Sequence, residues 1–225
     1  MIERYTRPEM GAIWSLENKF QAWLKVEIAV CEAWHELGRI PTQDMESIRS
    51  QAGFELDRIL ALEEETKHDV IAFLSAVEEK VGPASRFIHM GCTSSDIVDT
   101  ANALLMVQAG ELILEDLDRL LLTLQDMAQT YKGRLAMGRT HGVHAEPLSY
   151  GLKLASFYAE FSRHKERWKR AVDQIRVGKI SGAVGTYAHL LPELEAKACT
   201  RLGLSPYPIS TQIIQRDRHA EYFSS

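Results

Sequence analysis

Apolar residues recur every three or four positions through much of the chain, which is the spacing of one face of an α-helix. In the first such segment the pattern ends at Gly38 and Pro41, as a helix should. Shorter helices are expected at about residues 42–52, 55–65 and 69–80. The sequence therefore predicts an N-terminal helical region whose first long helix buries one face, formed by Phe20, Trp23, Leu24, Ile28, Cys31 and Trp34.

Two longer helices are expected in the second half of the chain. No proline occurs between Ile97 and Tyr131, and apolar residues there are spaced alternately by four and three, as in the seam of a coiled coil. The seam consists of Ile113, Leu117, Leu120, Leu124, Met127 and Tyr131. A second long helix is expected from Pro147 to about Val177, and its small-residue face consists of Leu152, Ala155, Ala159 and Ser162. Helices of this length need neighbours throughout, which favours a bundle.

The predicted fold is all-α. No segment alternates apolar and polar residues strongly enough for a sheet, and no fixed-period repeat occurs. We expect an N-terminal helical domain at residues 1–111 and the first part of a central helical-bundle domain at residues 112–225. In the second range, Pro192 opens a short helix and Asp217 lies near the first turn of another. Because this last pattern stops early, we expect the chain to be truncated.

Composition narrows the class of function. The 225 residues are 45% hydrophobic and 25% charged, and the net charge of -5 argues against wholesale nucleic-acid binding. The basic run at residues 163–170 is interpreted as a solvated helix face. The three cysteines lack CxxC spacing, so neither a disulfide framework nor a zinc site is expected. Without an apolar leader or a run of about 18 apolar residues, the protein is expected to be cytoplasmic, with no membrane partner.

The segment MGRTHGVHAEP, residues 137–147, breaks the helical pattern between the two long helices. Its two glycines and several polar side chains stand where leucine and alanine would continue a helix at no cost, and such local rule-breaking tends to mark function. His141 and His144 have the spacing of metal ligands, but no glutamate follows the first histidine, as a metalloprotease helix requires. We therefore favour a function other than metal binding.

Other polar residues fall at the expected breaks between helices. With His141, these residues are Arg4, Lys67, His68, Thr93, Ser94 and Gln212. A bundle can gather them into one cleft, where Arg and Lys bind phosphate, hydroxyls at a helix N-terminus bind carboxylate, and a histidine transfers protons. In GCTSSD, Ser94 or Ser95 is expected to cap a helix, with Asp96 favoured by the helix dipole. This set predicts a pocket for a ligand with several negative groups.

Six motifs carry a resemblance to a known family. TSSDIVDTA, GRTHGVHAEP, KISGAVGTYA and PISTQIIQRDRHA resemble the aspartase/fumarase superfamily, and MIERYTRPEM and KHDV narrow the likeness to its members that cleave succinylated purine nucleotides. The resemblance implies a carbon-nitrogen lyase of purine biosynthesis. Such an enzyme eliminates fumarate from N6-succinyl-AMP to give AMP, and from SAICAR to give AICAR. It implies no metal and no organic cofactor, and a homotetramer whose active sites each draw on three chains.

The same resemblance implies roles for single residues. His141 matches the general acid that protonates the leaving nitrogen, and His68 assists it nearby. The implied substrate-binding residues are Arg4 and Tyr5 for the phosphate, Lys67 and Asp69 beside the same pocket, Thr93 and Ser94 for the succinyl carboxylates, and Gln212. Three further residues lie near these motifs without an implied role: His89, Arg139 and Arg216. The role of His144 stays open.

One superfamily feature is absent from the sequence. The serine-rich loop of the form Gly-Ser-Ser-x-Met-Pro-x-Lys-x-Asn supplies the serine base of the superfamily, and it does not occur among these residues. We therefore expect this chain to be the N-terminal portion of such an enzyme and to be inactive alone. Two alternatives are an argininosuccinate-cleaving lyase, against which the RY and KHDV motifs speak, and a noncatalytic helical scaffold, against which the retained His141 and His68 speak.

Overall fold

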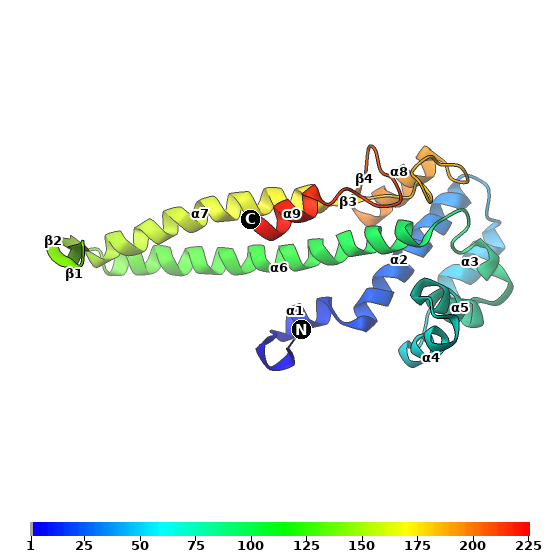
Figure 1. Cartoon of the computed structure of the whole chain (residues 1–225), viewed down its shortest axis with the longest axis horizontal. Helices are drawn as coiled ribbons and strands as arrows, with labels where there is room; N and C mark the ends of the chain where they lie inside the picture. The colour runs from blue at the N-terminus through cyan, green and yellow to red at the C-terminus, as the bar shows by residue number, and fades with distance from the viewer. Residues whose placement is uncertain (1) are drawn as a thin grey trace. The chain divides into compact units, whose positions relative to one another are not determined.

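The computed structural model describes residues 2–225 and is built mainly of helices, as predicted (Figure 1). The helices are η1 (Glu3–Tyr5), α1 (Pro8–Ile13), α2 (Leu16–Glu36), α3 (Thr42–Gln51), α4 (Leu56–Thr66), α5 (Asp69–Val81), η2 (Gly82–Phe87), α6 (Ser94–Thr130), α7 (Tyr150–Ile175), α8 (Pro192–Leu202) and α9 (Asp217–Ser224). The strands are β1 (Leu135–Thr140), β2 (Val143–Ser149), β3 (Val177–Gly178) and β4 (Ser205–Pro206). The three short helices expected before residue 81 are present within one residue at each end.

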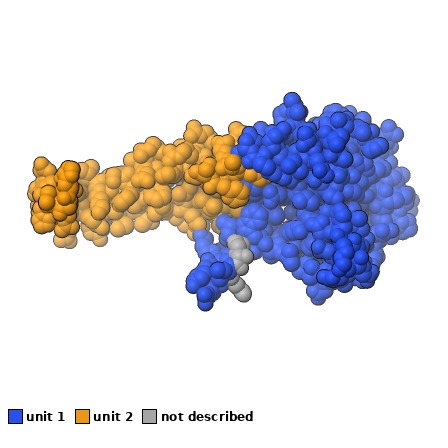
Figure 2. Space-filling view, viewed as in Figure 1, with its two compact units in different colours: residues 1–108, 175–218 blue, residues 109–174, 219–225 orange. Residues whose placement is uncertain are grey.

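The chain forms two compact units (Figure 2). Unit 1 contains residues 1–108 and 175–218, and unit 2 contains residues 109–174 and 219–225. These units are defined by contacts within the structure, and the domain division expected at residue 111 stays a prediction. The chain returns to unit 1 after α7, however, so the units are not two successive stretches of sequence.

The core of unit 1 is organised around α2. Ser15 caps this helix by accepting a hydrogen bond from the Asn18 amide at 3.1 Å. Phe20 and Trp23 on its buried face pack against Phe73 of α5, with ring centroids 5.8 and 5.6 Å apart. The face predicted from the sequence is buried throughout except at Ile28, which is half-buried.

Unit 2 is a helical hairpin in which α7 runs back beside α6 (Figure 1). Trp168 donates a hydrogen bond to the Gly110 carbonyl at 2.9 Å. Where α7 begins beside the end of α6, a Cβ on Gly151 would lie 2.4 Å from the Ala128 carbonyl oxygen. Only glycine therefore allows the two helices to approach this closely. The predicted seam of α6 is half-buried within the chain, with Leu124 alone fully buried.

Residues 135–149 form a β-hairpin, so the expectation of no strands was wrong here. β1 and β2 pair antiparallel, and Pro147 lies in β2 opposite Met137 rather than opening a helix. Helix α7 begins instead at Tyr150, where Ser149 Oγ accepts the Leu152 amide at 3.3 Å. The strands are short and alternate poorly, which explains why the periodicity missed them. A second small sheet pairs β3 with β4 in parallel.

Helix α6 is long and apolar enough by composition to cross a membrane. Asn102, Gln108 and Glu111 interrupt its apolar residues, so it contains no run of 18 apolar residues, in agreement with the sequence analysis. In the structure 61% of its most apolar 18-residue window is buried inside the protein, as in a core helix of a soluble protein.

Candidate active site

His141 lies at the tip of the hairpin in unit 2. Thr140 pairs with Val143, so His141 and Gly142 form a two-residue turn, and both have positive φ, 51° and 76°. This is the pattern of a type I′ turn, in which glycine and asparagine are the usual residues. A histidine in this backbone region is strained, and its side chain is exposed. The turn therefore presents an imidazole that a ligand can reach.

The strands behind the tip contain a bulge, in which Gly138 of β1 lies opposite two residues of β2. A Cβ there would lie 2.4 Å from the Glu146 carbonyl oxygen, and the pairing register shifts between Met137 and Arg139. Arg139 pairs with His144, and its Nη2 lies 3.5 Å from the Nε2 of that ring. The structure thus gives Arg139 and His144 a mutual contact beside His141.

Lys67, His68 and Asp69 form the turn between α4 and α5 in unit 1. Lys67 ends α4 with a left-handed backbone, φ 52°, and His68 caps α5 by accepting the Ile71 amide on Nδ1 at 3.4 Å. Because Nδ1 accepts, the neutral ring carries its proton on Nε2, where it is able to donate to a ligand. On the other side of the turn, Asp69 Oδ2 lies 3.8 Å from the Lys19 ammonium.

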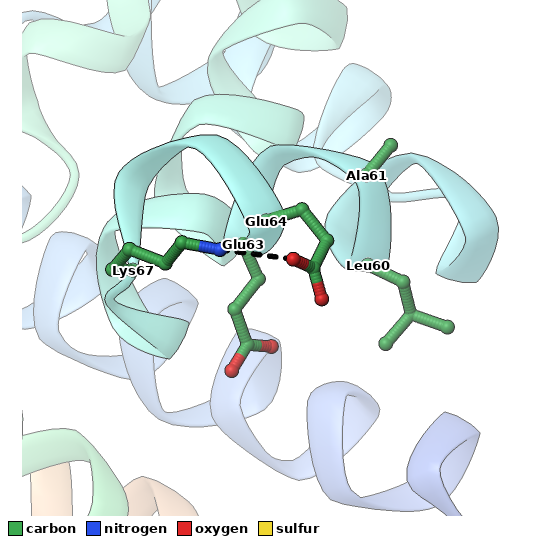
Figure 3. Close-up of a pocket in the computed structure, with 5 residues that line it drawn as sticks. All are labelled: Leu60, Ala61, Glu63, Glu64 and Lys67. Carbon is green, nitrogen blue, oxygen red and sulfur yellow. Dashed lines mark hydrogen bonds and ion pairs between the residues drawn. The ribbon is translucent and has the colours of Figure 1, made fainter.

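The Lys67 side chain lines an open hollow of about 750 Å³ along α4 (Figure 3). Its ammonium donates to Glu64 Oε2 at 2.9 Å, and Glu63 also lines the hollow. With two carboxylates against one ammonium, this hollow repels a ligand with several negative groups. Lys67 would have to leave Glu64 to bind such a ligand.

Thr93 and Ser94 lie at the N-terminus of α6 in unit 1, and both are half-buried. The helix begins at Ser94, so Ser94 and Ser95 stand in the first turn and not at the cap position expected from the sequence. Instead, Asp96 reaches back and its Oδ2 accepts the Thr93 amide at 2.9 Å, as the acidic residue of a capping box does. This bond fixes Thr93 against the helix end.

Gln212 lies in the loop before α9, with an exposed side chain. Its carbonyl accepts a hydrogen bond from Lys179 Nζ at 3.0 Å. The same ammonium lies 2.6 Å from Asp96 Oδ1, and neither charged side chain is exposed. Thr93 and Gln212, which belong to different segments, are thus joined through one buried ion pair.

His89 forms a close pair with the buried Glu27 of α2. Its Nδ1 lies 2.6 Å from Glu27 Oε1, and its backbone amide donates to Oε2 at 3.0 Å. Burial acts to lower the pKa of His89, but the hydrogen bond and the charge of Glu27 outweigh it, so the pKa is raised above its ordinary value. Glu27 therefore favours the protonated form of His89 and also holds its backbone amide.

The remaining predicted residues have simple surroundings. Arg4 and Tyr5 form η1, with the guanidinium 4.8 Å from the centre of the Tyr5 ring, and both side chains are exposed. Arg216 binds Asp99 through two hydrogen bonds, the shorter of 2.8 Å. That pair anchors the segment next to Gln212.

The predicted residues divide between the two units. His141 belongs to unit 2, and all the residues predicted to bind substrate, together with His68, belong to unit 1. Within unit 1, direct contacts group Lys67, His68 and Asp69 in one turn and link Thr93 to Gln212 through charged residues. Sequence reasoning gave no role to those linking residues or to Glu27. The signals were present, because Glu27 interrupts an apolar helix face and Lys179 lies in the KISGAVGTYA motif.

Among residues 2–225, four residues other than glycine have positive φ: Lys67, His89, His141 and Tyr187. Two of them, Lys67 and His141, are residues for which the resemblance implies a role. A strained backbone of this kind costs about 1–3 kcal/mol and clusters at functional sites. The roles of these residues stay a prediction.

The part of the chain that the structure describes contains no group of three His, Cys, Asp or Glu side chains placed to hold a metal ion. All three cysteines are free thiols. Burial raises the pKa of the Cys199 thiol to about 12 and raises those of Cys31 and Cys92 as well. None of these thiols has the character of a nucleophile.

A family model described as Lyase matches residues 3–225. The adenylosuccinate lyase of Bacillus subtilis (strain 168) is 53% identical over all of the chain, and that of Synechocystis sp. is 54% identical over 99% of it. Each alignment covers 52% of the relative, so the chain spans about half the length of the curated relatives it matches.

Solved structures of similar fold include two bacterial enzymes. A fumarate lyase from Mesorhizobium sp. BNC1 has a TM-score of 0.88 at 26% identity, covering 96% of this chain and 52% of that one. The 3-carboxy-cis,cis-muconate lactonizing enzyme from Pseudomonas putida has a TM-score of 0.89 at 27% identity, covering 98% of this chain and 52% of that one. Both share the fold described above.

Proposed function

Because the chain belongs to the lyase family, within the aspartase/fumarase superfamily, we propose that it is the N-terminal portion of an adenylosuccinate lyase. In this proposal the whole enzyme eliminates fumarate from N6-succinyl-AMP to give AMP, and from SAICAR to give AICAR. The observation that carries the proposal is the identity of 50–54% with curated adenylosuccinate lyases along the chain. The enzyme is proposed to be a cytoplasmic homotetramer that needs no cofactor.

The elimination removes a weakly acidic proton beside a carboxylate and expels a nitrogen. It therefore needs a base, positive or hydrogen-bonding groups for the developing negative charge, and an acid for the leaving nitrogen. We assign the acid to His141, whose ring stands on an exposed and strained turn. His68 assists, since its Nε2 proton is available to a ligand while Nδ1 caps α5.

Binding of the substrate is assigned to the residues of unit 1. Arg4 and Tyr5 bind the phosphate end, and Lys67 and Asp69 lie beside it, with the Lys67 ammonium released from Glu64. Thr93 and Ser94 take the succinyl carboxylates at the N-terminus of α6, where free amides and the helix dipole favour anions. Gln212 completes the set.

The general base is not assigned to this chain, because the serine-rich loop is absent from its sequence. Residues 1–225 alone are therefore expected to release no fumarate. Mixing them with a polypeptide that carries the remaining half of the enzyme is expected to restore release. Fumarate release by residues 1–225 alone would contradict this division of the catalytic groups.

The acid assignment is tested in the full-length enzyme with His141→Ala. Turnover of N6-succinyl-AMP should be abolished while its binding, measured by calorimetry, stays largely intact, because the variant removes a transition-state proton donor and no charge anchor. His164→Ala, at a partly exposed histidine of α7, is the matched control and should keep turnover. Near-normal turnover of His141→Ala would refute the assignment.

The substrate class is tested by competition and by Arg4→Ala. AMP should inhibit the full-length enzyme, whereas an argininosuccinate-cleaving lyase should ignore it. Arg4→Ala should weaken AMP binding and leave fumarate binding little changed, because the arginine is assigned to the phosphate. No turnover of any succinylated nucleotide would favour the noncatalytic scaffold.

A further inference from the structure

The ion pair between Lys179 and Asp96 is the most deeply buried charged contact described in unit 1. Lys179 Nζ and Asp96 Oδ1 lie 2.6 Å apart, and both side chains have 0% exposure. Removing two charges from water costs several kcal/mol per ion, and an apolar pair of similar volume often stabilises a protein at least as well. The fold alone therefore gives little reason for this pair.

Asp96 uses both of its carboxylate oxygens to hold backbone. Oδ2 accepts the Thr93 amide at 2.9 Å, and Oδ1 accepts the Ser181 amide at 3.1 Å. The Gly182 amide lies 3.2 Å from each oxygen. One side chain thus joins the segment that contains Thr93 to the glycine-rich segment after β3.

Lys179 extends this link to a third segment. Besides Asp96, its ammonium donates to the carbonyls of Gly182 at 2.8 Å and Gln212 at 3.0 Å, so its three protons all have acceptors. Its own backbone is held by Thr100, whose hydroxyl donates to the Lys179 carbonyl at 2.9 Å and accepts its amide at 3.0 Å. The ammonium is therefore fixed at its base and at its tip.

The loop of Gln212 has a second attachment to the same helix. Asp99, one turn after Asp96, accepts the Ile214 amide on Oδ2 at 2.9 Å. The residue between these two attachments is Ile213, which leaves the Gln212 backbone little freedom. The first turns of α6 thus place this loop through two carboxylates.

We propose that Lys179 and Asp96 are positioning residues, whose buried ion pair holds Thr93 and Gln212 in the arrangement that binds the substrate. Neither residue touches the substrate. The inference rests on the proposed function, because that function assigns substrate contacts to Thr93 and Gln212. It adds that two residues without a substrate contact determine the affinity.

The decisive experiment compares single and double variants of the full-length enzyme. Lys179→Met leaves a buried carboxylate without its cation and should lower the melting temperature strongly. Lys179→Met with Asp96→Asn removes both charges and should recover the part of that stability lost to the unpaired charge, although the asparagine amide offers one acceptor oxygen where the carboxylate offered two. The double variant cannot restore the bond to the Gln212 carbonyl, because methionine has no proton to donate.

The expected result is that the double variant is more stable than Lys179→Met, whereas its affinity for the substrate does not return. Its KM for N6-succinyl-AMP should stay raised by about tenfold or more, the effect of losing one good hydrogen bond to the substrate. Its kcat should fall by a smaller factor, since His141 belongs to unit 2. Met45→Ala, in the fully buried core of α3, is the matched control: it lowers stability and should leave KM unchanged.

Two outcomes would overturn the inference. The first is a double variant with the parent KM, and the second is a rise in KM for Met45→Ala equal to that of the double variant, which would make affinity follow stability. Failure of the proposed function gives a different result, because the parent enzyme itself would then not cleave N6-succinyl-AMP.

Discussion

Replacing Glu27 by glutamine tests whether the His89 pair is charged in the folded protein. The glutamine amide offers one oxygen where the carboxylate offered two, so either the ring or the backbone amide of His89 loses its acceptor. Hydrogen bonds to charged groups contribute about 1.5–3 kcal/mol, and Glu27 is 1% exposed. We expect the free energy of unfolding to fall by about 2 kcal/mol below neutral pH. In a chain of this length, that lowers the melting temperature by about 4–8 °C.

The sign of the pH dependence follows from the raised pKa of His89. A histidine whose pKa is higher in the folded state contributes stability that is fully present below its unfolded pKa of about 6.5. That contribution is lost as the pH rises through the raised native value. The difference in melting temperature between the parent and Glu27→Gln should therefore be largest near pH 6 and should narrow towards pH 9.

Thermal unfolding followed by circular dichroism at both pH values measures this difference on residues 1–225. Glu32→Gln on the same helix is the matched control, because Glu32 binds Arg49 through two hydrogen bonds of 2.6 Å. Arg49 lowers the pKa of Glu32 and does not itself titrate in this range, so the control difference should be flat between the two pH values. A Glu27→Gln difference that is flat or widens with pH would refute the charged pair.

Three further predictions concern other parts of the chain. Gly138→Ala should disrupt the hairpin, because its Cβ would lie 2.4 Å from the Glu146 carbonyl oxygen. Gly142→Ala meets open space and should lower the free energy of unfolding by only about 1–2 kcal/mol because of its positive φ. Limited proteolysis should therefore cleave the hairpin faster in Gly138→Ala, and equal cleavage of the two variants would contradict the geometry. Gly151→Ala should destabilise unit 2 in urea unfolding, because its Cβ would clash with the Ala128 carbonyl oxygen. Gly133→Ala, whose Cβ would meet nothing within 4 Å, should leave the stability unchanged or raise it. A Gly133→Ala variant less stable than Gly151→Ala would be inconsistent with the close approach of α6 and α7. The three thiols, of Cys31, Cys92 and Cys199, should react with iodoacetamide at pH 8 far more slowly in the native chain than in urea, because burial raises their pKa. Mass spectrometry measures both reaction rates, and equal rates would contradict the burial of these thiols.

The helices could be predicted from the sequence because their signals are local. The spacing of Phe20, Trp23 and Cys31 reports one helix face whatever that face packs against, and the breaks at Gly38 and Pro41 act on their own neighbours. The hairpin gave no such signal, since its turn is His-Gly rather than Asn-Gly and its strands hold few alternating apolar residues.

The candidate site could be predicted only in part for the same reason. Motifs mark Thr93, His68 and His141 by the type and order of nearby residues. The partners that fix such residues lie far away in sequence, as Glu27 does from His89 and Lys179 from Asp96. These pairs form only when the helices pack, so no local pattern contains them. The sequence therefore identified candidate site residues, and the partners that hold them were visible only in the structure.

The left-handed backbone at Lys67 and His141 allows selection for stability to be separated from selection for activity by experiment. Glycine or asparagine would relieve the backbone strain at either position. Either substitution would also remove the charged side chain of Lys67 or the titratable side chain of His141. A variant library sorted only for resistance to protease should therefore drift towards glycine and asparagine there. A library of the full-length enzyme sorted for turnover should retain lysine and histidine. The positions at which the two libraries differ would identify residues that lower the stability of the protein but are needed for its activity.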